Sequence, residues 1–174
     1  MVSTKNFIIS QIIGVFALAL LVISFQKKSR NSLIKLQTGS SLLYSLQYLF
    51  LGAFSGSIVH FICAVRNVIF YKFEKKVPLK YLIITIVVML STLFITYDGL
   101  ISVLPVLATV LYSTALWKGD VKIIRIIDII CCLLFIAYAL RVSALMAFLA
   151  TIIEMISALV GLYEYDFKPR IKKK

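Results

Sequence analysis

The chain has 174 residues, 61% of them hydrophobic, and a mean hydropathy of +1.02. Soluble domains are about half apolar. Apolar stretches of about 20 residues are typical of segments that cross a bilayer. The net charge of +12 does not indicate nucleic-acid binding here, because cytoplasmic loops of membrane proteins collect Lys and Arg. The cysteines, Cys63, Cys131 and Cys132, all lie in apolar segments, so the sequence predicts neither a disulfide framework nor a cysteine-based metal site.

Seven apolar segments follow one another along the chain, each about as long as a helix that spans a membrane. Because backbone groups in lipid must be hydrogen-bonded internally, each segment is expected to be helical. The predicted spans are residues 7–25, 33–51, 53–71, 79–97, 100–117, 121–140 and 142–163. The second and third segments, and the sixth and seventh, are separated so briefly that each pair could form one long kinked helix. A turn is favoured, since such a helix would be nearly twice as long as the hydrocarbon layer is thick.

Basic residues are distributed unevenly between the predicted loops. They follow the first, third and fifth segments and fill the C-terminal tail, whereas the opposite side carries Lys5 and Arg141. The positive-inside rule therefore predicts an N-terminus outside and a C-terminus in the cytoplasm. The charges of Lys27, Lys28 and Arg30 follow the first segment rather than precede it, so this segment is expected to be a retained helix and not a cleaved signal peptide.

The first three and the last three segments share one layout: a helix, a short basic loop, a helix, almost no loop, and a helix. The register that places Tyr48 on Tyr138 also places Asn67 on Ser157. A single fourth helix restores the direction of the second copy, so the repeats are predicted to be parallel. The sequence thus predicts an all-α polytopic membrane domain of about seven transmembrane helices in a 3+1+3 arrangement. Its parts are a first three-helix repeat (1–76), a linker helix (77–98), a second three-helix repeat (99–166) and a basic cytoplasmic tail (167–174).

This plan resembles that of the SWEET and PQ-loop membrane proteins, whose three-helix unit has a polar, Gln-containing end to its first helix and an Asn late in its third. Here Gln26 follows Phe25 where a proline is expected, Asn67 lies in the third segment, and Ser157 takes the Asn place in the second copy. In those families a Pro-Gln pair bends the first helix. The proline is missing here, so the usual cause of that bend is absent. The resemblance implies a transporter in which Asn67 and Ser157 flank a central solute site and Gln26 marks the cytoplasmic end of a moving helix.

A second resemblance is to the YgjV-like bacterial inner-membrane proteins. It rests on FQKKSRNSLIKLQ at residues 25–37, YLFLGAFSG at residues 48–56, the Arg66-Asn67 pair and LWKGD at residues 116–120. The likeness extends loosely across most of the chain. It implies a small multi-pass protein of the bacterial inner membrane, without implying an activity.

Five ionisable residues within the predicted spans stand out: His60, Arg66, Asp128, Glu154 and, nearer the interface, Lys35. Charge inside a membrane is costly and usually faces the interior of a bundle. Measured from the segment centres, Glu154 lies near the midplane, and Arg66 and Asp128 lie slightly to the cytoplasmic side. These depths permit Arg66 to pair with Asp128 or Glu154, either as a structural ion pair or as part of a substrate or proton pathway. For His60, a hydrogen bond that packs helices is favoured over a proton relay.

Asn67, Ser157, Tyr48 and Tyr138 are the predicted contacts for a polar solute, since an amide both donates and accepts hydrogen bonds; alternatively, such residues only bond neighbouring helices. The chain has one His and lacks a glycine-rich phosphate loop, a nucleophile elbow and an HExxH motif, so no enzymatic activity, cofactor or metal is expected. The preferred hypothesis is a small-solute transporter working by alternating access, and the alternative is a non-transporting membrane scaffold or regulatory protein. The expected partners are the lipid bilayer, a small polar solute and a second copy in a homo-oligomer, without nucleic acid.

Overall fold

The computed structural model describes residues 4–51, 54–73, 77–96, 100–141 and 145–168. Its helices are α1 Thr4–Phe25, α2 Arg30–Phe50, α3 Phe54–Lys72, α4 Leu79–Thr96, the 3₁₀ turn η1 Leu100–Ser102, α5 Val103–Lys118, α6 Val121–Arg141, α7 Leu145–Leu162 and the π-helical turn η2 Tyr163–Phe167. The seven α-helices of these described residues begin and end within a few residues of the seven predicted spans. The prediction of an all-α chain is therefore confirmed.

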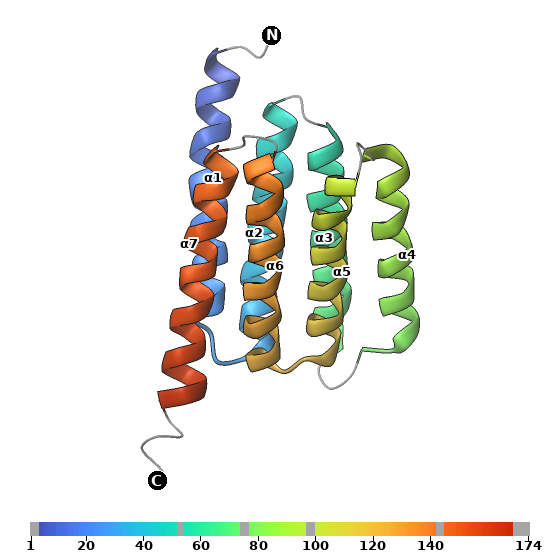
Figure 1. Cartoon of the computed structure of the whole chain (residues 1–174), viewed down its shortest axis with the longest axis vertical. Coiled ribbons are helices and arrows are strands. Elements are labelled where there is room, and N and C mark those ends of the chain that lie inside the picture. The colour runs from blue at the N-terminus through green and yellow to red at the C-terminus, as the bar shows by residue number, and fades with distance from the viewer. Residues whose placement is uncertain (1–3, 52–53, 74–76, 97–99, 142–144, 169–174) are drawn as a thin grey trace.

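The helices stand side by side in two layers (Figure 1). α1, α2 and α3 form one layer, and α7, α6 and α5 form the other, with α1 packed against α7 at one edge. α4 closes the opposite edge, in contact with α3 and α5. α2 and α3 pack against each other as separate helices, as do α6 and α7, so neither pair forms one long kinked helix. Residues 52–53 and 142–144, which connect these pairs in the sequence, lie outside the described residues.

One end of the bundle, which we call the basic end, carries most of the positive charge. The α1–α2 and α5–α6 connections lie there, at the bottom of Figure 1. Its described basic residues are Lys27, Lys28, Arg30, Lys35, Lys72, Lys80, Lys118, Lys122, Arg125 and Lys168. At the other end the described basic residues are Lys5 and Arg141. The charge asymmetry seen along the sequence is therefore an asymmetry between the two ends of the folded bundle.

Local sequence explains where helices begin and end at the basic end. Ser29 precedes α2, and its hydroxyl accepts a hydrogen bond from the backbone N–H of Ser32 at 3.2 Å, which makes it an N-cap. α5 ends at Lys118, and the next residue, Gly119, has a φ of +80°, a left-handed conformation that glycine adopts without strain. The carboxylate of Asp120 then accepts from the N–H of Lys122 at 2.9 Å and caps α6. These caps give short connections, so α1 and α2 lie side by side, as do α5 and α6.

An apolar cluster closes the basic end. Leu33 and Ile34 of α2, Phe70 of α3, Leu116 of α5 and Ile124 of α6 are fully buried and belong to one packed cluster, which we call the basic-end cluster. Its members come from both layers. Close packing of these side chains therefore holds the two layers together at this end of the bundle.

The first layer is held together by small and hydroxyl side chains. Ser40 of α2 donates to the carbonyl of Ala17 in α1 at 2.8 Å, and Ser45 donates to the carbonyl of Ser57 in α3 at 2.9 Å. Helices in a membrane associate through such contacts, because lipid offers no hydrophobic advantage to the packing of two apolar faces. The α1–α2–α3 layer thus has the chemistry of a membrane helix interface.

The outer surface of the bundle is apolar, the reverse of a soluble protein. Val15 of α1 is 68% exposed and Phe94 of α4 is 91% exposed, whereas Gln37, Arg66 and Asn67 are buried. Two described helices, Thr4–Phe25 and Phe148–Phe167, are long and apolar enough to cross a membrane, and Leu79–Phe94 and Val103–Lys118 are shorter apolar helices. Polar residues that face the interior lower the hydropathy of α2, α3 and α6.

Candidate functional site

A cavity of about 270 Å³ lies between the two layers, close to the middle of the helices. Its lining side chains come from α1, α2 and α3 on one side and from α5, α6 and α7 on the other. Residues singled out from the sequence form much of this lining: Tyr48, His60, Arg66, Asn67, Asp128 and Glu154. The fold therefore brings together polar groups that lie far apart along the chain.

The α3 wall of the cavity presents hydrogen-bond donors. The buried guanidinium of Arg66 donates to Asn67 Oδ1 from Nε at 3.1 Å and from Nη2 at 2.9 Å, and to Ser113 Oγ from Nη1 at 2.9 Å. It also lies 5.8 Å from the centroid of the Tyr112 ring. A guanidinium has five N–H donors, so these three bonds leave donors to spare. Because Asn67 Oδ1 accepts from Arg66, its Nδ2 is the free end of the amide, and this buried atom has no partner among the described residues.

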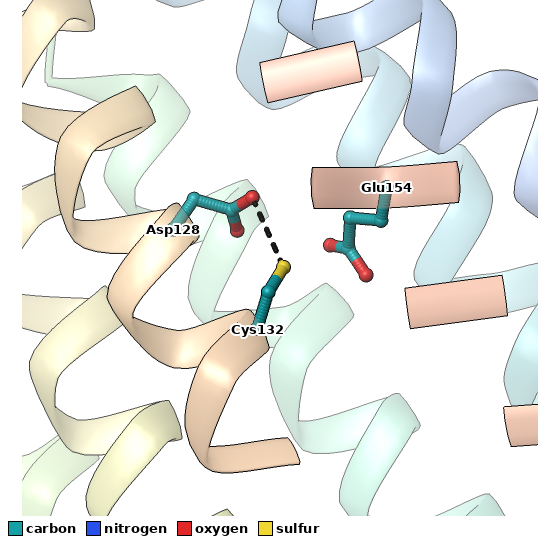
Figure 2. Close-up of side chains that lie close together, drawn as sticks. All are labelled: Asp128, Cys132 and Glu154. Atoms are coloured by element: carbon teal, nitrogen blue, oxygen red, sulfur yellow. Dashed lines mark hydrogen bonds between the residues drawn. The ribbon is translucent and has the colours of Figure 1, made fainter. Parts of the chain in front are cut away.

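The opposite wall presents two carboxyl groups and a thiol (Figure 2). Asp128 and Cys132 stand one helical turn apart on α6, and Cys132 Sγ donates to Asp128 Oδ2 at 3.7 Å. Glu154 of α7 points toward them, and the possible ligand atoms of the three residues all lie within 4.8 Å of one another. We call these three residues the acidic cluster. The spacing of residues along the sequence could not reveal it, because its third member comes from a different helix.

The ion pair predicted between Arg66 and Asp128 or Glu154 is not formed among the described residues. Arg66 donates instead to neutral oxygens of α3 and α5. The ion pair that does form within the described part of the chain is a different one, between Arg125 Nη1 and Asp166 Oδ2 at 2.7 Å, at the basic end. Arg66 and the two carboxyl groups therefore line the same cavity without an ion pair between them in the described structure.

His60 is held by aromatic rings rather than by the predicted hydrogen bond. In the described structure its ring centroid lies 5.2 Å from that of Tyr48, with 15° between the planes, and 5.2 Å from that of Tyr44, with 35° between the planes. All three rings line the cavity. Tyr138, the counterpart of Tyr48 in the second triplet, is half-buried and is not part of the described cavity lining.

Ser157 does not reach the cavity, contrary to the prediction that it flanks a solute site with Asn67. Its hydroxyl donates to the carbonyl of Val22 at 2.8 Å and accepts from Gln26 Nε2 at 2.9 Å. Gln26 Nε2 also donates to the Ser157 carbonyl at 2.9 Å. Two residues that the sequence assigned to different roles therefore bond to each other, and they join α7 to the C-terminal end of α1.

One family model matches the sequence over nearly all of this helical region. The model is Imp-YgjV, described as a bacterial inner membrane protein, and the match covers residues 8–168. The chain belongs to this family. No curated protein and no solved structure is significantly similar to the chain, so the likeness to SWEET and PQ-loop proteins receives no support from these comparisons.

Membership of the YgjV family places this bundle in the bacterial inner membrane. The exposed apolar side chains of the bundle then face lipid, as Val15 and Phe94 illustrate. The polar groups around the cavity lie inside the protein, which is where membrane proteins keep ionisable side chains that serve pairing or function. The setting and the geometry together make the cavity the candidate functional site of this YgjV-family chain.

Sequence reasoning also missed the role of Arg125, because this residue of the sixth predicted span was counted with the basic residues of the neighbouring loop. It is 1% exposed, and its guanidinium donates to the carbonyl of Phe25 at 3.0 Å, to the carbonyl of Lys27 at 2.7 Å and to Asp166 at 2.7 Å. Carbonyls at a helix C-terminus have no partner within the helix and carry partial negative charge. The side chain thus joins α6 to the end of α1 and to η2.

Arg30 makes a similar set of contacts at the start of α2. It donates to the carbonyls of Phe70 at 3.2 Å and Phe73 at 3.2 Å at the end of α3, and to the carbonyl of Leu116 in α5 at 3.3 Å. We call Arg30 and Arg125, with these contacts, the two arginine clamps. Together with the basic-end cluster they hold that end of the bundle closed.

Proposed function

We propose that this protein is a small-solute transporter, or a transporter-like protein, that binds its solute in the central cavity. The observation that carries the proposal is the buried amide nitrogen of Asn67, which lines the cavity and has no acceptor among the described residues. Leaving a buried donor without a partner costs about 1–3 kcal/mol. A solute with a hydroxyl, carbonyl or carboxylate oxygen would offset that cost.

The size and walls of the cavity define the solute. About 270 Å³ lies just below the roughly 300–1,000 Å³ typical of pockets for drug-sized ligands, which suits a smaller polar molecule. The spare N–H groups of Arg66, beside Asn67, favour the oxygen atoms of that solute. Tyr44 and Tyr48 supply ring faces together with polar hydroxyl ends.

The arginine clamps support a parallel 3+1+3 repeat. Arg30, from the middle helix of the first triplet, binds the end of α3 in its own triplet and the end of α5 in the other. Arg125, from the middle helix of the second triplet, binds η2 beyond α7 in its own triplet and the end of α1 in the other. Helix by helix, exchanging the two triplets converts one pattern into the other, although the register that pairs Tyr48 with Tyr138 pairs Arg125 with Lys35 and not with Arg30. Two equivalent three-helix bundles are the parts that alternating access would move against each other.

The basic end is closed in this conformation, so release of a solute there requires the two triplets to separate. The separation would break the contacts that the clamps make between triplets, Arg30 with α5 and Arg125 with α1. It would also break the bond between Gln26 and Ser157. All three contacts are polar, so water can replace each of them as the end opens. Such contacts can therefore form and break in each transport cycle.

The orientation we propose has the basic end in the cytoplasm and the N-terminus outside. The concentration of Lys and Arg at that end supports it, because such residues remain on the cytoplasmic side during insertion. A fluorescent protein fused after Lys174 is expected to be fluorescent in cells, and alkaline phosphatase fused at the same place is expected to be inactive. An active phosphatase fusion would show that the orientation is the reverse of the one proposed.

Uptake into proteoliposomes tests the transport proposal. A panel of labelled sugars, vitamins and amino acids is expected to contain a solute that the wild-type protein takes up and that Asn67→Ala takes up at least about tenfold more slowly, the loss that about 1.4 kcal/mol produces. Ser91→Ala is the matched control, because this exposed hydroxyl lies on α4, which does not line the described cavity. Uptake that stays flat across the panel with folded protein would favour a scaffold or regulatory protein.

A further inference from the structure

The acidic cluster has the geometry of a ligand set. Asp128 and Cys132 stand on one face of α6, and Figure 2 shows the carboxyl group of Glu154 directed at them from α7. One oxygen from each carboxyl group and the sulfur lie within 4.8 Å of one another. Three donor atoms at such separations can approach a single cation with only small rotations of their side chains.

The carboxyl groups of the cluster form no ion pair among the described residues, although the guanidinium of Arg66 lines the same cavity. Among the described residues, the ion pair is that of Arg125 with Asp166 at the basic end. The two carboxyl groups of the acidic cluster are therefore not bonded to any basic side chain in the described structure. A carboxylate kept inside a membrane protein is costly unless it is paired or binds a metal.

The side chain of Gln37, on a different helix, gives independent evidence for a bound cation. This side chain of α2 is 3% exposed and lines the same cavity. Its nitrogen donates to Tyr112 and to Ser24 Oγ, whereas its buried oxygen Oε1 has no partner in the described structure. An amide oxygen can accept a hydrogen bond or ligate a metal, but it cannot donate. A cation with its remaining water ligands would serve this oxygen as well as the carboxylates.

We infer that Asp128, Cys132 and Glu154 form a binding site for a thiophilic divalent cation such as Zn²⁺. Zn²⁺ binds thiolate sulfur and carboxylate oxygen, whereas Mg²⁺ and Ca²⁺ prefer oxygen ligands alone, so the sulfur of Cys132 sets the class. On binding, the metal replaces the thiol proton that Cys132 now directs at Asp128, and that proton leaves to solvent. Water in the cavity completes the coordination. This site is independent of transport, because the metal can bind whether or not a solute moves.

Co²⁺ binding to the purified, untagged protein in detergent tests the site, because a Co²⁺–thiolate bond has a charge-transfer band in the near ultraviolet. One Co²⁺ per chain is expected, displaced by Zn²⁺, with the band absent in Cys132→Ser. Cys131→Ser is the matched control, since that thiol is buried on the same helix and donates to the carbonyl of Ala108 at 3.1 Å outside the cluster. Asp128→Asn and Glu154→Gln are expected to weaken binding at least about tenfold, since even outer-shell changes cost about 10–100-fold.

Three results would overturn the inference: no binding of Co²⁺ or Zn²⁺ by the folded wild-type protein, a band unchanged in Cys132→Ser, or a band lost equally in Cys131→Ser. Zinc K-edge X-ray absorption of the wild-type protein gives a second measurement that needs no variant to fold. A Zn–S distance of about 2.3 Å is expected. A spectrum with oxygen and nitrogen ligands alone would place the metal elsewhere. Uptake assays are not involved, so failure here leaves the transport proposal standing, and the reverse also holds.

Discussion

Replacing Arg125 with alanine is expected to destabilise the basic end of the bundle. The guanidinium is 1% exposed and donates to the carbonyls of Phe25 and Lys27 and to the carboxylate of Asp166, at 3.0, 2.7 and 2.7 Å. These acceptors belong to the end of α1, to the connection that follows it, and to η2. Loss of one side chain therefore disconnects three segments from α6 and leaves buried acceptors without donors.

The size of the effect follows from these three bonds. A hydrogen bond to a charged group contributes about 1.5–3 kcal/mol, and the two carbonyl bonds are taken at the lower end because their acceptors are neutral. The carboxylate of Asp166 is 18% exposed, so its pair with Arg125 is taken at about 1 kcal/mol. The expected loss is about 4 kcal/mol, within the roughly 3–5 kcal/mol observed when one partner of a buried pair is removed. Arg125→Lys keeps the charge without the planar fork, and about half of the loss is expected.

The free energy of unfolding can be measured by titrating SDS into protein held in mild detergent and following helix content by circular dichroism. Arg141→Ala is the matched control, because Arg141 ends the same helix and is exposed. Its expected effect is within about 0.5 kcal/mol. Wild-type stability in Arg125→Ala would refute the reasoning that this side chain joins three segments.

Three further changes test other contacts. Gly161→Ala is expected to lower the free energy of unfolding by about 1–3 kcal/mol in the same assay, because a Cβ there would lie 2.4 Å from the carbonyl oxygen of Phe25. Gln26→Ala and Ser157→Ala are expected to show a coupling of about 1 kcal/mol in a double-mutant cycle, because their side chains bond to each other. Arg30→Ala is expected to shift the fluorescence of Trp117, the single tryptophan, since Arg30 donates to the carbonyl of the preceding residue, Leu116.

Each of these tests has a control or a contrary outcome. Gly39→Ala serves as the comparison for the glycine change, because its Cβ would meet the mobile end of Leu20 at 3.2 Å, and a near-neutral effect is expected. An equal loss in both glycine variants would argue against the close backbone approach of α7 to α1. Strict additivity in the double-mutant cycle would contradict the α1–α7 bond. An emission spectrum in Arg30→Ala identical to that of Lys5→Ala, a change at the opposite end, would contradict the α5 contact.

Apolar segments and the placement of charge determined the number of helices, their bounds and the basic end without any tertiary information. The physical reason is that a helix in lipid must satisfy its own backbone and must match the membrane thickness, and both are local properties of a segment. The same cost of charge in lipid indicated which residues face the interior. Of the five residues singled out for that reason, His60, Arg66, Asp128 and Glu154 line the central cavity. The fifth, Lys35, is not part of the described lining and lies over the Tyr71 ring instead.

Only the tertiary structure decided which of these groups meet. Each residue along a helix turns the side chain by about 100°, so a shift of one position moves a group from the cavity to a neighbouring helix. Ser157 was expected beside Asn67 and instead bonds Gln26 on α1. The approach of Glu154 to Asp128 and Cys132, and the burial of Arg125, depend on how several helices are rotated against one another. That rotation is set by the packing of all the helices at once, which the pattern along a single segment does not contain.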